Sequence, residues 1–200
     1  SRQYAPIAAQ KRCRVVDKSS AFRMEPDVPL IVPEINGDVL RKSNSYIIAN
    51  PNCTTAIAMM ALSPLNNRFG LSRIKATSFQ AVSGAGAKGL EELRREMHLL
   101  GRNLPMTPKV FPHQIAYNVI PHIDTFLDNG YTKEEWKMQE EGAKILRLKT
   151  FKASATCVRV PVERAHTIDI LAQFRGDVNA ERARACLEKA PGIDVVDDPS

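Results

Sequence analysis

Short β-branched runs alternate with helical patterns along this 200-residue chain, and this alternation limits the possible folds more than any other feature. Strand-like runs lie at 13–17, 46–49, 74–82, 157–162, 167–174 and 193–196, and a further short apolar run lies between prolines at 27–33. Helical patterns lie at 54–65, 90–100, 132–146 and 179–187. We expect the runs at 157–162 and 167–174 to pair with each other. The alternation predicts an α/β or α+β fold class.

Two of the expected helices carry recognisable start signals. Thr132 is followed three residues later by Glu135, which is the spacing of a capping box. Asn179 precedes the last helical pattern and is expected to cap it. The helix at 54–65 is apolar on nearly all sides, which predicts that it is buried.

Charge and composition exclude several classes of protein. Lys and Arg number 28 against 22 Asp and Glu, a net charge of +6 that suits anionic small molecules. The basic residues are scattered and aromatic residues make up only 6%, so we expect no nucleic-acid partner. The chain has no run of 18 apolar residues and does not open with a signal sequence, so we expect no membrane association. The four cysteines are far apart, which predicts no metal site and a reducing compartment.

Cys53 stands where a strand turns into a helix. Pro51 keeps Asn50 out of the α conformation, so the chain turns after the strand that ends at Ala49. The positive end of the following helix dipole favours a thiolate over a thiol. The Asn52 amide and the Cys53 N–H are donors for an oxyanion on a carbonyl carbon attacked by sulfur. Alone, the pattern also fits a small cysteine buried in a packed turn.

His166 lies at the junction of the two strand runs near the end of the chain. A neutral imidazole presented from such a scaffold can move a proton during catalysis. A histidine with a purely structural role fits the same position.

A glycine pattern follows the strand-like run at 74–82. Gly84, Gly86 and Gly89 match G-x-G-x-x-G before a helix, the arrangement of a dinucleotide fingerprint. The acidic strand end expected about 20 residues later is missing, because that stretch is helical or rich in proline. We therefore predict a turn that contacts a ligand or lets two chain segments approach closely.

Charged side chains on two helical segments fit solvated faces. The 90–100 helix has an apolar face formed by leucines and Met97, and its charged residues are expected on the solvated face: Glu91, Glu92, Arg94, Arg95 and Glu96. Glu141 and Lys144 are three residues apart, which is typical of a surface ion pair.

Taken together, the order and spacing of several segments resemble the aspartate-semialdehyde dehydrogenase family. The matching segments are VVDKSSAFRM (15–24), VPLIVPEIN (28–36), ANPNCTT (49–55), SFQAVSGAG (78–86), YNVIPHID (117–124), EEWKMQEEGAKIL (134–146) and RVPVERAHT (159–167). The resemblance implies an α+β catalytic and dimerisation domain with a mixed sheet at 53–200, incomplete at its C-terminus. It implies that 1–52 is the last part of a Rossmann-like NADP-binding domain.

The family resemblance also implies an activity and its setting. The reaction is the reversible, NADP-dependent conversion of aspartyl phosphate to aspartate semialdehyde and phosphate through a cysteine thioester. It serves the biosynthesis of lysine, threonine, methionine and isoleucine. The implied partners are this small-molecule substrate and further copies of the chain, as a homodimer or homotetramer in the cytoplasm.

Residue by residue, the resemblance implies a set of catalytic and substrate-binding roles. Cys53 is the nucleophile, with Asn52 as a donor beside it, and His166 is the acid/base. Gln80 orients the substrate near the sulfur. Arg159 clamps the substrate α-carboxylate, which suits a bidentate guanidinium.

The remaining implied roles concern the ammonium, phosphate and cofactor. Glu141 pairs with the substrate ammonium, and Arg23 and Lys144 form the phosphate site. Ser83 and Gly84 contact the nicotinamide side of NADP.

The chain departs from the family pattern at three places. Ala165 replaces the usual Gly before the histidine; if this position needs a positive φ, Ala strains the loop by about 1 kcal/mol and can displace His166. Lys18 replaces the usual Asn beside the serine pair. The strand and Gly-rich loop that carry the adenosine have no match, so we expect the 200-residue chain alone to bind NADP poorly and to lack turnover.

Two alternatives remain open at this stage. One is another acyl-phosphate reductase with the same cysteine chemistry. The other is an inactive binding or scaffold protein that retains the fold, an alternative that the residues at 18 and 165 favour.

Overall fold

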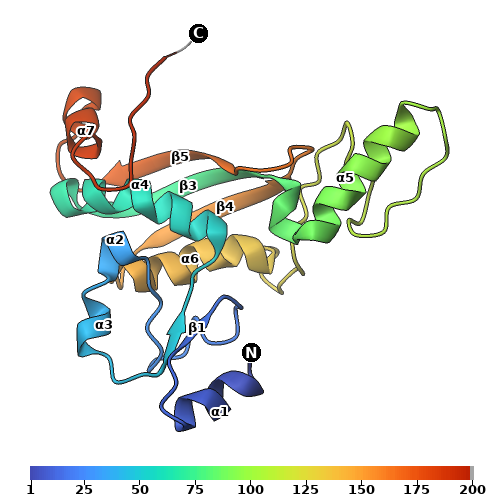
Figure 1. Ribbon diagram of the computed structural model, residues 1–200. Coiled ribbons are helices and arrows are strands. Elements are labelled where there is room, and N and C mark those ends of the chain that lie inside the picture. The colour runs from blue at the N-terminus through green and yellow to red at the C-terminus, as the bar shows by residue number, and fades with distance from the viewer. Residues whose placement is uncertain (199–200) are drawn as a thin grey trace. The chain divides into compact units, whose positions relative to one another are not determined.

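The computed structural model describes residues 1–198 (Figure 1). Its elements in chain order are α1 (Tyr4–Gln10), β1 (Val15–Asp17), α2 (Pro33–Asn36), α3 (Val39–Lys42), β2 (Ile47–Ala49), α4 (Cys53–Phe69), β3 (Leu71–Gln80), the 3-10 helix η1 (Val82–Ala85), α5 (Ala87–Leu100), α6 (Lys133–Leu146), β4 (Lys152–Arg159), β5 (Thr167–Phe174) and α7 (Ala180–Leu187). This mixture of helices and strands confirms the predicted fold class.

The chain divides into two compact units. Unit 1 contains Ser1–Ile74, Lys137–Ala153 and the chain from Ala172, and unit 2 contains Lys75–Trp136 and Ser154–Leu171. The predicted domain boundary between residues 52 and 53 concerns cofactor binding and stays a prediction. Within residues 1–198, none of the helices combines the length and the apolar character that a membrane-spanning segment needs.

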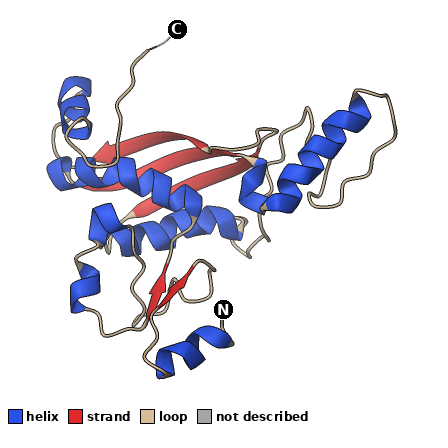
Figure 2. Cartoon of the chain, viewed as in Figure 1, coloured by secondary structure: helices blue, strands red, loops and turns tan. Residues whose placement is uncertain are grey.

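In unit 1, β1 and β2 form a parallel pair (Figure 2, red), with Val16 opposite Ile48. The apolar run at 27–33 joins the other edge of β2, where Leu30 forms a parallel bridge with Ala49. The main chain of this run supplies both hydrogen bonds to Ala49, at 2.9 and 3.0 Å. This pairing fixes the end of β2, and hence the start of the turn that leads into α4.

Helix α4 begins one residue before the predicted helix, at Cys53, and ends four residues after it, at Phe69. Asn52 caps the N-terminus, because its Oδ1 accepts a hydrogen bond from the Thr55 N–H at 3.1 Å. Gly70 ends the helix in the left-handed region, at φ 73°, where a side chain would be strained. The expectation that the helix is buried on all sides is wrong, because Ile57 is 45% exposed. Only the face that carries Ala58, Met59 and Leu62 is fully buried in unit 1.

The three-stranded sheet has the order β4-β3-β5, so the predicted pairing of the last two strands is wrong. In unit 2, the connection from β4 to β5 hydrogen-bonds to the chain at the end of β3. Val160 donates to the Gln80 carbonyl at 3.0 Å, and Val162 accepts from the Val82 N–H at 2.9 Å. The connection thus crosses the end of β3, and β5 reaches the other edge of that strand.

In unit 2, helix α5 packs Glu92 and Glu96 inward, so the prediction of a solvated face is wrong for these two acids, whereas Glu91 and Arg94 are exposed as predicted. Glu92 is 3% exposed and Glu96 is fully buried, whereas Met97 is 43% exposed. Both carboxylates accept backbone N–H groups from the irregular segment that follows α5, at 109–111 and 115–116. The two carboxylates therefore accept the backbone N–H groups of this segment, which in a strand or helix would bond to backbone carbonyls.

The predictions near the end of the chain have mixed outcomes. The capping box is confirmed, since the Thr132 N–H donates to Glu135 at 2.7 Å and Thr132 Oγ1 accepts from the Glu135 N–H at 3.3 Å. Asn179 caps α7 through the Arg182 N–H at 2.9 Å, as predicted. The expected strand at 193–196 is wrong, because these residues are irregular and find no neighbouring strand in the described part of the chain.

Candidate active site

The structure divides the predicted site residues between the two units. Unit 1 holds what we call the Cys53 cluster, made of Arg23, Asn52, Cys53, Glu141 and Lys144. Unit 2 holds what we call the Gln80 cluster, made of Gln80, Ser83, Gly84, Arg159 and His166. Among residues 1–198, no group of three His, Cys, Asp or Glu side chains is arranged to hold a metal ion.

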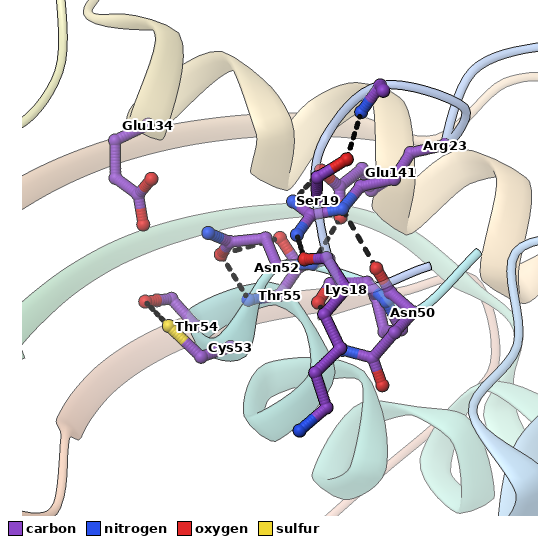
Figure 3. A network of polar contacts seen from close by, with 12 residues as sticks. Lys18, Ser19, Arg23, Asn50, Asn52, Cys53, Thr54, Thr55, Glu134 and Glu141 are labelled. Carbon is purple, nitrogen blue, oxygen red and sulfur yellow. Dashed lines mark hydrogen bonds and ion pairs between the residues drawn. The ribbon is translucent and has the colours of Figure 1, made fainter. Parts of the chain in front are cut away.

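Cys53 is the first residue of α4, and its side chain is exposed. Its Sγ lies 3.9 Å from Thr54 Oγ1 (Figure 3). The preceding residue, Asn52, is only 7% exposed and commits its Oδ1 to the helix cap. The opposite end of the amide is a pair of N–H donors, so Asn52 has the chemistry of the predicted oxyanion donor.

A buried carboxylate fixes the turn before Cys53. Glu141 is 2% exposed and accepts from the Asn52 N–H at 2.6 Å through Oε2 and from Arg23 Nη1 at 3.0 Å through Oε1 (Figure 3). Burial raises the pKa of Glu141, and the bonds from Asn52 and Arg23 act in the opposite direction. Arg23 also donates to the carbonyls of Asn50 and Lys18, at 2.8 and 3.2 Å. The loop at 18–23 and the turn at 50–52 are therefore tied to α6.

The predicted surface pair between Glu141 and Lys144 is wrong, since Glu141 is buried and bonded to Arg23. Lys144 Nζ instead donates to three backbone carbonyls, those of Arg23, Glu25 and Val28, at 2.7–2.9 Å. Burial lowers the pKa of Lys144, and the Glu25 carboxylate opposes this shift. The three-residue spacing of Glu141 and Lys144 on the helix carries no information about the distant loop carbonyls that bind the Lys144 ammonium.

In unit 2, Gln80 ends β3 and is 1% exposed. Its Nε2 donates to Ser78 Oγ at 3.1 Å and to Glu134 Oε1 at 3.2 Å. Glu134, which is 7% exposed in the first turn of α6, is not one of the predicted site residues. Its position two helical turns before Glu141 was the available signal, because residues seven apart share a helix face.

Both main-chain groups of Ala81 hold predicted site residues. Arg159 Nη1 donates to the Ala81 carbonyl at 2.8 Å, and the Ala81 N–H donates to His166 Nδ1 at 3.1 Å. Since Nδ1 accepts, the neutral ring carries its proton on Nε2. Burial lowers the pKa of His166, the Arg159 charge lowers it further, and the Glu134 charge raises it. The imidazole is therefore favoured in its neutral form, with Nε2 as the donor.

The glycine turn after β3 lies against the same residues. A Cβ placed on Gly84 would lie 2.6 Å from Arg159 Nη1 and 3.4 Å from His166 Cε1. A Cβ on Gly89 would lie 2.4 Å from the Val82 carbonyl oxygen, which confirms the predicted close approach of chain segments. The exposed backbone at Gly84 is a cradle that a flat ring can approach, and this fits the nicotinamide end of a dinucleotide.

Ala165 has φ 70°, in the left-handed region that favours glycine. The position where the family usually has Gly thus has a positive φ, and the strained Ala165 directly precedes His166. The His166 side chain nevertheless reaches the Ala81 N–H.

Comparison with protein families gives two matches along the chain. Residues 1–43 match the NAD binding domain of semialdehyde dehydrogenases, and residues 62–200 match the dimerisation domain of semialdehyde dehydrogenases. The second match covers more than half of the chain.

Individual relatives agree with these matches. The aspartate-semialdehyde dehydrogenase of Aquifex aeolicus is 46% identical over 100% of this chain, and the chain spans 59% of that protein. The crystal structure of aspartate semialdehyde dehydrogenase II from Vibrio cholerae, complexed with ASA, superposes with a TM-score of 0.96 at 41% identity, over 100% of this chain and 61% of that one. An aspartate semialdehyde dehydrogenase from Candida albicans with NADP superposes with a TM-score of 0.66 at 26% identity, over 91% of this chain and 50% of that one. The chain belongs to the semialdehyde dehydrogenase family.

Proposed function

We propose that the protein carrying this chain catalyses the reversible NADP-dependent reductive dephosphorylation of aspartyl phosphate to aspartate semialdehyde. The chain spans about three fifths of the length of the curated relatives it matches, so the activity is proposed for the protein that contains it. The observation that carries the proposal is the exposed Cys53 thiol at the first residue of α4, in a turn fixed by the buried Asn52 and Glu141.

In this proposal Cys53 Sγ attacks the acyl carbon of aspartyl phosphate and phosphate leaves, which forms a thioester. Backbone N–H groups at the start of α4 and the Asn52 amide stabilise the oxyanion of the tetrahedral intermediate. The helix dipole at this end favours the thiolate that attacks. The fixed turn supports this step because it keeps the sulfur and its donors in one geometry.

His166 acts through Nε2, the nitrogen that Ala81 leaves as the proton carrier. After hydride transfer, the Nε2–H group donates a hydrogen bond to the oxyanion on the former acyl carbon, and this oxyanion re-forms the C=O bond as the C–S bond breaks, which releases the aldehyde and the Cys53 thiolate. Arg159 binds the substrate α-carboxylate, and its bond to the Ala81 carbonyl supports this role by fixing the guanidinium. Gln80 orients the substrate beside the sulfur.

Glu141, Arg23 and Lys144 keep their predicted roles as ammonium and phosphate partners in this proposal. To bind the substrate ammonium, Glu141 has to exchange a bond from Arg23 or from the Asn52 N–H for one from the ligand. To bind phosphate, Lys144 has to turn one donor away from its backbone carbonyls. Phosphate carries enough charge to compete for these cations.

Ser83 and Gly84 hold the nicotinamide end of NADP in this proposal. When bound, NADPH supplies the hydride that reduces the thioester. The cradle at Gly84 supports this placement, because a side chain there would fill the space beside Arg159 and His166. The Candida albicans relative in complex with NADP supports the choice of NADP over NAD.

The setting of the reaction is also part of the proposal. The match to a dimerisation domain supports a homodimer or homotetramer. The widely spaced free cysteines support a cytoplasmic location, where thiols stay reduced.

The test is an assay of the whole protein that contains this chain. Aspartate semialdehyde, phosphate and NADP⁺ should yield NADPH only when all three are present. Cys53→Ala should abolish the reaction, whereas Cys13→Ala, which removes another exposed thiol, should not change it. Aspartyl phosphate without NADPH should leave an acyl group on the peptide that contains Cys53.

The outcomes separate the alternatives. A related acyl-phosphate reductase would reduce its own acyl phosphate and would form no NADPH from aspartate semialdehyde. An inactive scaffold would show neither NADPH formation nor the acyl adduct.

A further inference from the structure

Glu134 is a buried acid that none of the proposed roles uses. It lies in the first turn of α6, is 7% exposed, and accepts from Gln80 Nε2 at 3.2 Å. A carboxylate buried to this degree is costly unless it is hydrogen-bonded and faces a favourable charge. The hydrogen bond from Gln80 therefore offsets part of the cost of burying this carboxylate.

The first effect of Glu134 is on the orientation of the Gln80 amide. An ionised carboxylate can only accept hydrogen bonds, so the amide has to present its nitrogen to Glu134. The same nitrogen donates to Ser78 Oγ at 3.1 Å, on the strand that carries Gln80. The two bonds fix one of the two possible amide orientations of a side chain that is 1% exposed.

The second effect of Glu134 is on the charge around His166. Two charged groups that act on this ring are Arg159 from β4 and Glu134 from α6. The guanidinium is held nearby through the Ala81 carbonyl, and the ring through the Ala81 N–H. A neutral residue at 134 would remove a negative charge that opposes the positive charge of Arg159 at the ring.

We propose that Glu134 is a positioning residue, whose carboxylate fixes the Gln80 amide and offsets the charge of Arg159 at His166. The catalytic meaning of this role depends on the proposed function, while the two contacts themselves do not. Glu134 acts through Gln80 and His166, and no contact with substrate is needed.

The test compares Glu134→Gln with Glu140→Gln in the whole protein. Gln keeps the size of the side chain and one acceptor for Gln80 but removes the charge. Glu140 is exposed on the same helix, so its variant controls for any general change in charge. The pKa of His166, followed by NMR of the ring, should fall in Glu134→Gln and stay at the wild-type value in Glu140→Gln. An unchanged His166 titration in Glu134→Gln overturns the proposal.

Kinetics give a second readout. Because the neutral imidazole is the active form, the acid limb of the kcat/KM profile should move to lower pH in Glu134→Gln. Replacing the charged acceptor of the Gln80 hydrogen bond with a neutral one should raise KM for aspartate semialdehyde by about fivefold to tenfold. In a Gln80→Leu background, the same change at 134 should leave KM unaltered but still move the pH profile. A KM effect that persists in this background overturns the role through Gln80.

Two further measurements keep the proposal falsifiable. If Glu134→Gln does not fold, the side-chain amide resonances of Gln80 in the wild-type protein should follow the titration of a carboxylate, and resonances that stay constant with pH overturn the proposal. If the wild-type protein lacks dehydrogenase activity, the proposed function fails, while the NMR titrations still decide the role of Glu134.

Discussion

Replacing Glu92 with Gln removes the charge that holds the segment after α5 in unit 2. The carboxylate accepts from the backbone N–H of Lys109 through both oxygens, at 2.9 and 3.0 Å, and from Val110 and Phe111 at 2.9 and 3.1 Å. Arg95 adds a contact at 3.4 Å. Gln can present one oxygen to these donors, and its amide nitrogen then faces the Lys109 N–H.

The magnitude follows from this geometry. Hydrogen bonds to a charged group contribute about 1.5–3 kcal/mol each, against about 0.5–1.5 kcal/mol for neutral ones. Lys109 and Val110 are exposed residues, so water near them can offset part of the loss. We therefore expect Glu92→Gln to lower the free energy of unfolding by about 1–3 kcal/mol.

The deficit should depend on pH in a defined direction. Burial raises the pKa of Glu92, but the N–H groups of Val110, Phe111 and Lys109 together outweigh it, and the pKa lies below the ordinary value of 4.5. The stabilisation by the carboxylate is thus fully present above pH 4.5 and is lost as the pH falls through the folded-state pKa. Wild type and variant should converge in acid.

Urea unfolding and amide hydrogen exchange measure both effects, with Glu91→Gln as the matched control because Glu91 is the exposed neighbour on α5. Exchange should accelerate at residues 109–111 in Glu92→Gln. The consequence extends to Arg159, since its guanidinium lies 5.8 Å from the centre of the Phe111 ring. Equal stability of the two variants at neutral pH, with unchanged exchange at 109–111, would refute the reasoning.

Three further predictions follow from other buried groups and from the strained turn. At pH 8, iodoacetamide should modify the exposed Cys53 and spare the buried Cys157, because burial raises the pKa of that thiol to about 11; peptide mapping that finds both modified equally would contradict this. Lys144→Met removes three hydrogen bonds to the loop at 23–28 and should lower the free energy of unfolding by about 1–3 kcal/mol in urea, an effect that faster exchange in the loop should accompany. Ala165→Gly relieves a positive φ and should raise the melting temperature, by a stability gain of about 0.5–1 kcal/mol, whereas a lower melting temperature would argue against strain.

Local signals in the sequence predicted most of the elements. The Thr132 and Glu135 pair forms its capping box, and Asn179 caps its helix, because these interactions join residues three positions apart. The turn before Cys53 also follows from local rules about proline and helix starts. Such features depend on a few neighbouring residues and need no knowledge of the rest of the chain.

The errors arose where a side chain bonds to a distant main chain. Glu92 and Glu96 look like a solvated stripe, yet their partners are backbone amides 17–20 residues away in a segment without periodic side chains. Glu141 likewise bonds to an amide 89 residues away. A side-chain pattern carries no information about main-chain donors, since every residue except proline has one.

No feature of the sequence marks Ala81, although its main chain bonds to two of the predicted catalytic and binding residues. Its carbonyl fixes Arg159 and its N–H fixes His166, while its methyl group is fully buried. Many small residues at 81 would keep both bonds, so the identity of the residue does not reveal them. Proline would not, because it lacks the N–H that sets the protonated nitrogen of His166. The guanidinium and the imidazole are therefore both anchored to the main chain of one residue, directly after the end of β3.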